Sequence, residues 1–258
     1  MIKLVYVIVR RGELSAADFR RYWLNEHGPL VAAQAEALKL RKYVQSHPFD
    51  DAASEAMAAA RGMLGPVDGV TEVWWDSLED FQAAYTTPAG MEAGRVLAAD
   101  EAKFIDFERS SVFLTEEHPI FDRTADQPLG GDAVKATYLL ARRDDLTQAQ
   151  CHETWLRDHG PLVESHAATL RMAKYVQSHA IAPEINAALQ AGRNYQPPLD
   201  GITEVWMRSL DEMGGGDAAR DAAMALVEDE RRFVQMDRSR LFLTREHLIF
   251  DHTGGRER

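Results

Sequence analysis

The sequence contains very little cysteine and no long apolar run. Its single cysteine among 258 residues, Cys151, excludes an internal disulfide and is typical of a reducing compartment, so we expect a cytoplasmic protein. No apolar stretch approaches the roughly 20 residues of a transmembrane helix. The apolar segment from Ile2 to Val9 ends at Arg10-Arg11 and lacks the basic start of a signal peptide. We therefore predict a buried strand there and no association with a membrane.

Basic residues and phosphate-binding loops are also scarce. Lys and Arg number 29 against 41 Asp and Glu, which gives a formal net charge of −12. Because binding to phosphates needs clustered cations, a nucleic acid is excluded as a partner. No glycine-rich phosphate loop is present, so we expect no organic cofactor. The expected partner is a small molecule.

The chain repeats itself at a spacing of a whole domain. Three blocks recur 132 residues later: His27–Val31 as His159–Val163, Lys42–His47 as Lys174–His179, and Asp68–Trp74 as Asp200–Trp206. This period far exceeds the roughly 20–50 residues of a solenoid repeat. We therefore predict two tandem domains, at residues 1–123 and 134–252, joined by a linker at 124–133.

Each repeat has the pattern of a ferredoxin-like domain. Strands are predicted at 2–9, 42–47, 70–75 and 110–114, with helices between them. The first helix begins at Ser15 and is interrupted at Gly28-Pro29, and a second stretch is expected from Leu30 to about Leu38. The order β-α-β-β-α-β predicts an α+β fold. Because such a sheet has helices on one face only, we expect the two sheets to pack together as an intrachain pseudo-dimeric α/β barrel, in a monomer or a homodimer of it.

The ordered motifs of the two repeats resemble the EthD family, of the dimeric α/β-barrel superfamily. The resemblance covers nearly all of both halves and rests on Phe19-x-x-Tyr22-Trp23-x-x-x-His27-Gly28-Pro29-Leu30, Tyr43-x-Gln45-Ser46-His47, Asp68-Gly69-x-x-Glu72-x-Trp74 and Glu117-His118. It implies the ferredoxin-like fold. It also implies kinship with cofactor-free cyclases, isomerases, decarboxylases and dehydratases that act on phenolic or cyclic substrates.

His27 and its repeat His159 are the leading catalytic candidates. His27 follows Phe19 and Trp23 at helical spacing, so it is predicted to point between helix and sheet. His47 and His179 are expected as partners if the two imidazoles of each half converge on one cavity, where a neutral imidazole is a suitable general base. The alternatives are a satisfied core histidine at position 27 and a backbone cap at position 47.

Other residues are candidates for contacting the substrate. They are polar or aromatic side chains of the same motifs: Tyr6, Tyr22, Trp23, Gln45, Glu72 and Trp74 in the first half, and Tyr138, Trp155, Gln177, Glu204 and Trp206 in the second. The tryptophans fit a core role first, and flat pocket walls second. Glu72 and Glu204 need buried partners, for which Arg109, Arg238 or a tyrosine are candidates. His27, His47 and Glu72 form a conceivable metal set, but nothing in their spacing brings them together, so no metal is expected.

These residues predict a cofactor-independent lyase, isomerase, dehydratase or cyclase that acts on a small aromatic or phenolic molecule through histidine acid–base catalysis. Two alternatives stay open: an oxygen-dependent monooxygenase or haem-associated protein, and a non-catalytic ligand-binding protein. Either both pockets are active with different walls, or one is active while the other preserves the scaffold. The first half is favoured as the more family-like because it keeps Phe19, Tyr22 and Trp23 together. Cys151, which replaces Phe19, is expected to be a buried structural thiol.

Overall fold

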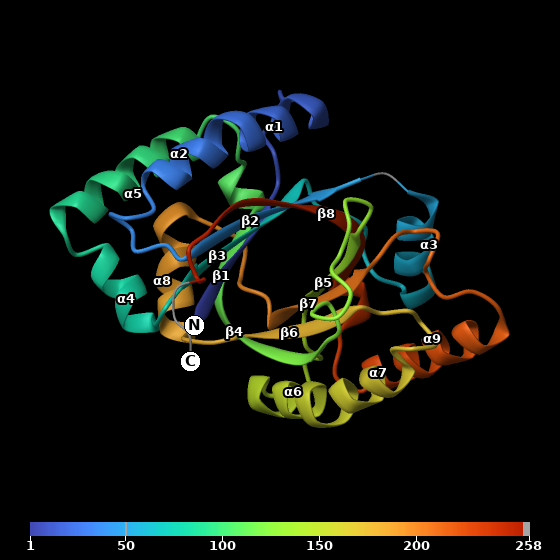
Figure 1. The fold of residues 1–258 in the computed structure, drawn as a ribbon. Coiled ribbons are helices and arrows are strands. Elements are labelled where there is room, and N and C mark those ends of the chain that lie inside the picture. Colours follow the sequence, from blue (N-terminus) through green and yellow to red (C-terminus); the bar gives the residue numbers. More distant parts are fainter. Residues whose placement is uncertain (50, 255–258) are drawn as a thin grey trace.

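The computed structural model describes residues 1–49 and 51–254, in which eight antiparallel strands form one closed barrel (Figure 1). Helices cover the outside of the barrel. The strand order around the barrel is β1-β3-β2-β8-β5-β7-β6-β4, and β4 pairs with β1 to close it. The first half therefore contributes the four neighbouring strands β4, β1, β3 and β2, and the second half contributes β8, β5, β7 and β6. The expected pseudo-dimeric α/β barrel is therefore confirmed. The strands are β1 (Ile2–Ile8), β2 (Lys42–Pro48), β3 (Gly69–Trp75), β4 (Ser111–Asp122), β5 (Val134–Leu140), β6 (Lys174–Ala180), β7 (Gly201–Met207) and β8 (Arg240–Asp251).

The last strand of each half is longer than the sequence predicts. Its first part pairs with the first strand of its own half, and its second part pairs with the other half: β4 with β6 and β8 with β2. The expected end at Leu114 is thus wrong, because the next eight residues find a free strand edge across the seam. Glu117 and His118 consequently lie within a strand, and these exchanged segments close the barrel.

The helix expected to be interrupted at Gly28-Pro29 continues through it. Helix α1 (Ala16–Tyr22) passes through a π-helical turn (Trp23–His27) into α2 (Gly28–Ala33). The Gly28 N–H donates to the Trp23 carbonyl five residues back, and the widened turn accommodates Pro29, which has no N–H to donate. The second half repeats this arrangement in α6 (Gln148–Thr154), a π turn (Trp155–His159) and α7 (Gly160–His166).

One helix of each half crosses to cover the other half. These are α3 (Ala52–Arg61) and α8 (Pro183–Arg193), which lie beside α9 and beside α4 and α5, respectively, in Figure 1. The Ser54 hydroxyl accepts a hydrogen bond from the Leu243 N–H at 3.0 Å, and the Asn186 amide oxygen accepts one from the Leu114 N–H at 2.9 Å. The sheet of each half is therefore partly covered by a helix from the other half of the same chain.

The remaining helices show where the halves differ. The first half has α4 (Leu78–Ala84) and α5 (Pro88–Glu101), whereas the second has α9 (Asp217–Glu230) and no described counterpart of α4. The segment Gly214-Gly215-Gly216 stands there instead, and glycine runs disfavour helix. Helix α4 ends at Ala84 and α5 begins at Pro88, so the two helices of the first half are separate. The division of the chain at 124–133 stays a prediction.

The barrel interior contains apolar side chains and a buried ionic network. Lys3 Nζ lies 3.2 Å from Glu72 and 2.5 Å from Glu204, and Lys135 Nζ lies 2.6 Å from each of these carboxylates. Burial alone would lower the pKa of both lysines, but the surrounding glutamates raise it above the usual range. The partners of Glu72 and Glu204 are thus lysines, and the expectation of Arg109, Arg238 or a tyrosine is wrong.

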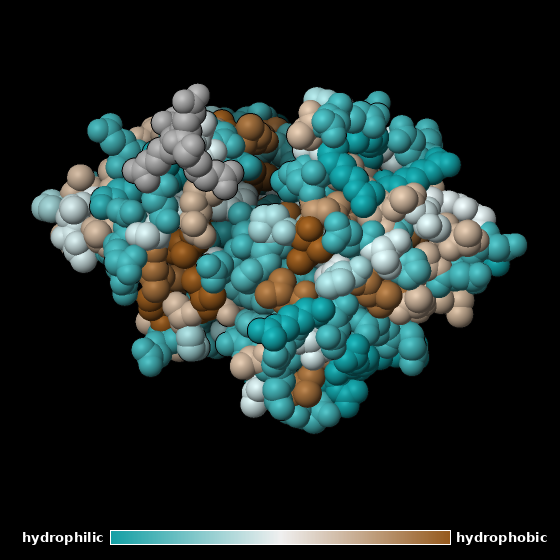
Figure 2. Space-filling view, turned by 60° about the horizontal axis from the view of Figure 1, so that its bottom comes forward, coloured by the Kyte–Doolittle hydropathy of each residue, from teal (hydrophilic) through white to brown (hydrophobic). Residues whose placement is uncertain are grey.

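The outer surface is mostly hydrophilic on the face shown in Figure 2, with apolar residues in separate groups. No helix in the described part of the chain is both long and apolar enough to cross a membrane.

Candidate active site

A cavity of about 310 Å³ lies between the outer face of the first-half sheet and the helices that cover it. Its deep wall is formed by outward-facing strand residues and by His27, all buried or nearly so. Exposed lining residues lie only at the end of α4 (Tyr85) and on α8 (Ala188, Gly192), so the cavity opens between these elements. Apolar and aromatic residues make up most of the lining: Leu4, Tyr6, Ile8, Val31, Leu38, Leu40, Tyr43, Val73, Trp75, Tyr85, Leu97, Ile105, Val112, Leu189 and Tyr195.

His27 and Asp100 form a buried dyad at this cavity. The π turn places the imidazole of His27 against α5, where its Nδ1 lies 2.9 Å from Asp100 Oδ2. The hydrogen bond from His27 is the main cause that lowers the pKa of Asp100 below its usual range. Because the ionised carboxylate can only accept, Nδ1 carries the hydrogen and the lone pair of the neutral ring is on Nε2. His27 lines the cavity, so this pair can act as a base toward a bound molecule.

Two further residues hold Asp100 in place. The Tyr22 hydroxyl donates to Asp100 Oδ1 at 2.6 Å, and Lys103 Nζ donates to the same oxygen at 2.9 Å. Tyr22 was expected to contact the substrate, but it orients the dyad and does not line the cavity. Asp100 was not predicted from the sequence, although the pair Asp100-Glu101 recurs 129 residues later as Asp229-Glu230.

The other polar groups of the cavity come from both halves. Glu101 of α5 pairs with Arg193 of α8, and the Tyr195 hydroxyl that follows α8 donates to the Tyr6 hydroxyl at 2.9 Å. Arg193 also donates to Tyr195 at 3.2 Å. Tyr6 therefore lies in the cavity as expected, whereas Arg193 and Tyr195 were not singled out. Arg193 repeats Arg61 132 residues later, which was a signal in the sequence.

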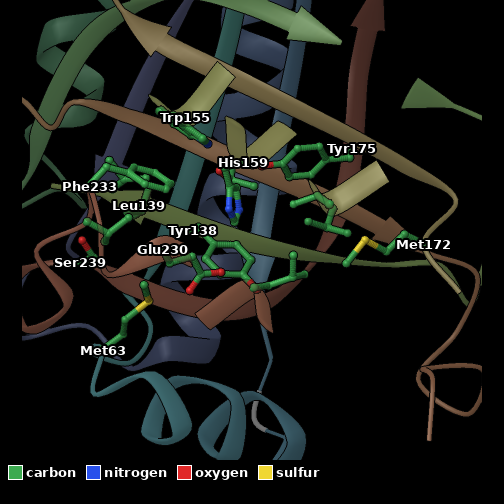
Figure 3. Close-up of a pocket in the computed structure, with 16 residues that line it drawn as sticks. Met63, Tyr138, Leu139, Trp155, His159, Met172, Tyr175, Glu230, Phe233 and Ser239 are labelled. Atoms are coloured by element: carbon green, nitrogen blue, oxygen red, sulfur yellow. The ribbon is translucent and has the colours of Figure 1, made fainter. Parts of the chain in front are cut away.

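The equivalent cavity of the second half has a volume of only about 30 Å³. Figure 3 shows the residues that line it. His159 keeps its dyad, with Nδ1 2.9 Å from Asp229 Oδ2, and lies among Trp155, Tyr175, Tyr138 and Glu230 in Figure 3. Arg61 of α3 pairs with Glu230 at 2.9 Å and lies over the Tyr138 ring at 5.4 Å. In the first half, Arg193 instead lies over Phe107. A buried arginine thus occupies space that the first half leaves open.

His47 and His179 do not join His27 and His159 at the cavities. The ring of His47 stacks on Trp23 at 4.4 Å, and its Nε2 contacts Gln45 Oε1 at 3.0 Å. Gln45 in turn donates to the Trp23 carbonyl and to the Tyr43 hydroxyl. His179, Gln177 and Trp155 repeat this arrangement. These residues hold the π turn against the sheet, which is a positioning role for the dyad.

Glu72, Trp74, Glu204 and Trp206 face the barrel interior, on the side of the sheet opposite the cavity. The cross-strand partner of Glu72 is Val5, whereas Tyr6 is opposite Thr71. Trp74 and Trp206 donate to the strand carboxylates Glu117 and Glu246. The metal set His27, His47 and Glu72 therefore does not converge. Among the described residues, the one carboxylate group with metal-like spacing is Glu72, Glu204 and Glu246, and Lys3 and Lys135 already neutralise it.

Cys151 is fully buried and lies near the Phe233 carbonyl. Burial raises the pKa of its thiol to about 12, so it fits the expected structural role.

The two stacked histidines predict a stability that depends on pH. Burial, His247 and Arg20 lower the pKa of His47 from 6.5 to about 3, and burial, His152 and His118 lower that of His179 to about 2. In the unfolded chain these two imidazoles bind protons as the pH falls through about 6.5, whereas in the folded chain they stay neutral. The free energy of unfolding therefore decreases below about pH 6.5, by at most about 1.4 kcal/mol per pH unit for each histidine.

This loss can be measured by urea unfolding at pH values from 7 to 4. The double variant His47→Phe/His179→Phe should show a flatter profile, and a variant of the exposed His252 should keep the profile of the unmodified protein. An unchanged slope in the double variant would contradict this origin.

Both halves of the chain match one known protein family. The EthD domain family model matches residues 11–108 and 143–237. No curated protein sequence matches the chain. An anthrone oxidase-like protein has a similar solved structure, with a TM-score of 0.53, 11% identity and coverage of 99% of this chain and 96% of that one. A candidate monooxygenase from Fusobacterium nucleatum also has a similar solved structure, with a TM-score of 0.50, 6% identity and coverage of 99% of this chain and 95% of that one. At such identities the two structures indicate a shared fold only.

Proposed function

The chain belongs to the EthD family, and we propose that its first-half cavity is the active site of a cofactor-independent enzyme that moves a proton on a small aromatic or phenolic molecule. The observation that carries this proposal is the buried His27–Asp100 pair in the wall of an apolar cavity. An oriented imidazole beside a largely apolar, enclosed space is the arrangement that general-base catalysis needs.

The reaction begins with removal of a proton from the substrate by His27 Nε2. Asp100 holds the ring and stabilises the positive charge that forms on it. Return of the proton to another atom of the same molecule completes an isomerisation or cyclisation. Its delivery to a leaving hydroxyl completes a dehydration. Apolar walls that include Trp75, Tyr43 and Val73 suit a flat ring system.

The second half is a scaffold in this proposal. It retains the dyad of His159 and Asp229, but the buried side chain of Arg61 and the space of only about 30 Å³ leave no room for a ring. We therefore expect one working site in each chain. The reason for favouring the first half is thus the size of its cavity, about 310 Å³ against about 30 Å³, rather than the motif residues that it keeps.

The test uses a panel of phenols and cyclic aromatic ketones in deuterated water. Wild-type protein should incorporate deuterium at carbon or form an isomerised or dehydrated product, followed by mass spectrometry and NMR. Ala188→Trp places an indole at the mouth of the cavity and should abolish the reaction. The matched control is Ala56→Trp, at the equivalent exposed position of α3, which should leave the rate unchanged.

Two results would contradict the proposal. Oxygen uptake coupled to loss of substrate would assign the oxygen-dependent alternative. Binding of panel members without any exchange or product would assign a ligand-binding protein.

A further inference from the structure

A charge-assisted chain of hydrogen bonds ends in the first-half cavity. Arg193 Nη1 donates to the Tyr195 hydroxyl oxygen at 3.2 Å, and Tyr195 donates its proton to the Tyr6 hydroxyl oxygen at 2.9 Å. Glu101 pairs with Arg193 and anchors the start of the chain. The guanidinium polarises the Tyr195 hydroxyl, and this in turn makes the Tyr6 hydroxyl a stronger donor, because linked hydrogen bonds reinforce one another.

The proton of Tyr6 is left for a ligand. Its hydroxyl oxygen accepts from Tyr195, and within residues 1–49 and 51–254 no group accepts the Tyr6 proton. Tyr6 is buried and lines the same cavity as His27. Burial and Glu101 raise the pKa of Tyr6 well above 10, so this hydroxyl remains protonated and acts as a donor.

We propose that Tyr6 donates a hydrogen bond to a substrate oxygen that gains negative charge, and that Tyr195 and Arg193 position and polarise it from the second half. This inference rests on the proposed function and narrows its substrate class. The substrate is an aromatic or cyclic ketone whose carbonyl group is adjacent to the carbon that His27 deprotonates. A donor aimed at developing oxyanion charge is among the strongest sources of catalysis.

The step balances without an oxidant. The proton of a carbon adjacent to the carbonyl moves to His27 Nε2, the C–H electron pair becomes a C=C bond, and the carbonyl π pair moves to oxygen. The resulting enolate oxygen is held by Tyr6. Protonated His27 then returns the proton to another carbon of the conjugated system, or to a β-hydroxyl group that leaves as water.

The second half lacks this chain and so provides a control. Met63 is the repeat of Tyr195, so the second-half cavity has a methionine where the first-half cavity has this tyrosine. Arg61 lies over the ring of Tyr138 at 5.4 Å. Tyr138, the repeat of Tyr6, is therefore not polarised by a second tyrosine.

The experiment compares an anionic probe with a neutral probe of similar shape. The affinities of 4-nitrophenolate and 4-nitrotoluene for the full chain are measured by calorimetric titration at mildly alkaline pH. Tyr6→Phe should weaken nitrophenolate binding about tenfold or more, the usual effect of losing a hydrogen bond to a charged group, and should leave nitrotoluene nearly unaffected. Tyr195→Phe and Arg193→Met should weaken nitrophenolate binding by a smaller factor, and Tyr138→Phe should change neither affinity.

The outcomes separate this inference from the proposed function. Equal losses for the two probes in Tyr6→Phe, or no effect of Tyr195→Phe on either probe, would overturn the inference even if deuterium exchange is found. A selective loss of nitrophenolate binding would support it even if no panel compound reacts, in which case the proposed function fails alone. Thermal unfolding of each variant shows whether the cavity is intact, and the ratio of the two affinities is insensitive to a merely structural effect.

Discussion

Substitution of His27 by glutamine should lower turnover about 10²- to 10⁴-fold, the usual contribution of a positioned general base. Glutamine has a similar reach and can still donate to Asp100, but it cannot take up a proton at the position of Nε2. The dyad distance of 2.9 Å, the burial of both side chains and the place of His27 in the cavity lining make its imidazole a base that an ionised partner orients. The rate is measured on the panel compound with the fastest exchange.

The matched control is His159→Gln. It removes an imidazole with the same partner distance, 2.9 Å to Asp229, from a pocket with no room for a substrate. Its rate should stay close to that of the unmodified protein. If both variants lose activity equally, the second half works as well. If neither does, His27 is not the base. Thermal unfolding should shift by similar amounts in the two variants, because the lost imidazole contacts are alike.

The repeat and the order of elements were sufficient to predict the barrel. Helical spacing also predicted correctly that His27 would point between helix and sheet, where it lines the cavity. The expected interruption at Gly28-Pro29 was wrong because the break is a π turn, which keeps the helix running while widening it. Backbone hydrogen bonding, which decides between a break and a bulge, is not visible in residue spacing.

Strand alternation explains which candidate residues fall outside the cavity. Alternation puts Glu72 and Trp74 on one face of β3 and Thr71 and Val73 on the other, but alternation alone does not say which face meets the helices. The register of β1 with β3 decides this by pairing Tyr6 with Thr71 and Val5 with Glu72. A one-residue change of register would have reversed the assignment.

The contributions of the second half could not be predicted from either repeat alone. Arg193 and Tyr195 reach the first-half cavity because α8 crosses the seam, and crossing is a property of the assembled barrel. The recurrence of Asp100 as Asp229 and of Lys3 as Lys135, in contrast, was visible in the sequence. Polar residues that recur at the repeat spacing are therefore useful candidates even when they lie in otherwise apolar segments.

The buried network leads to the second large prediction, which concerns stability. Lys135→Met should lower the free energy of unfolding by about 3–5 kcal/mol, the usual cost of leaving a buried charge without its partner. Glu72 and Glu204 would then share Lys3 alone, in a region where all four side chains are at most 2% exposed. Glu117 and Glu246 are 27% and 32% exposed and can turn toward solvent, so they do not worsen the loss.

Replacement of the whole network should behave differently from removal of one member. The quadruple variant Lys3→Met/Lys135→Met/Glu72→Leu/Glu204→Leu leaves no unpaired buried charge, so it should recover most of the stability lost in Lys135→Met. The exposed pair of Arg95 and Glu92 is the control, since breaking it should change the unfolding free energy by less than about 1 kcal/mol. Urea unfolding of the three variants measures these differences. A quadruple variant as unstable as Lys135→Met would show that the network stabilises the barrel through its geometry rather than merely avoiding the penalty of an unpaired charge.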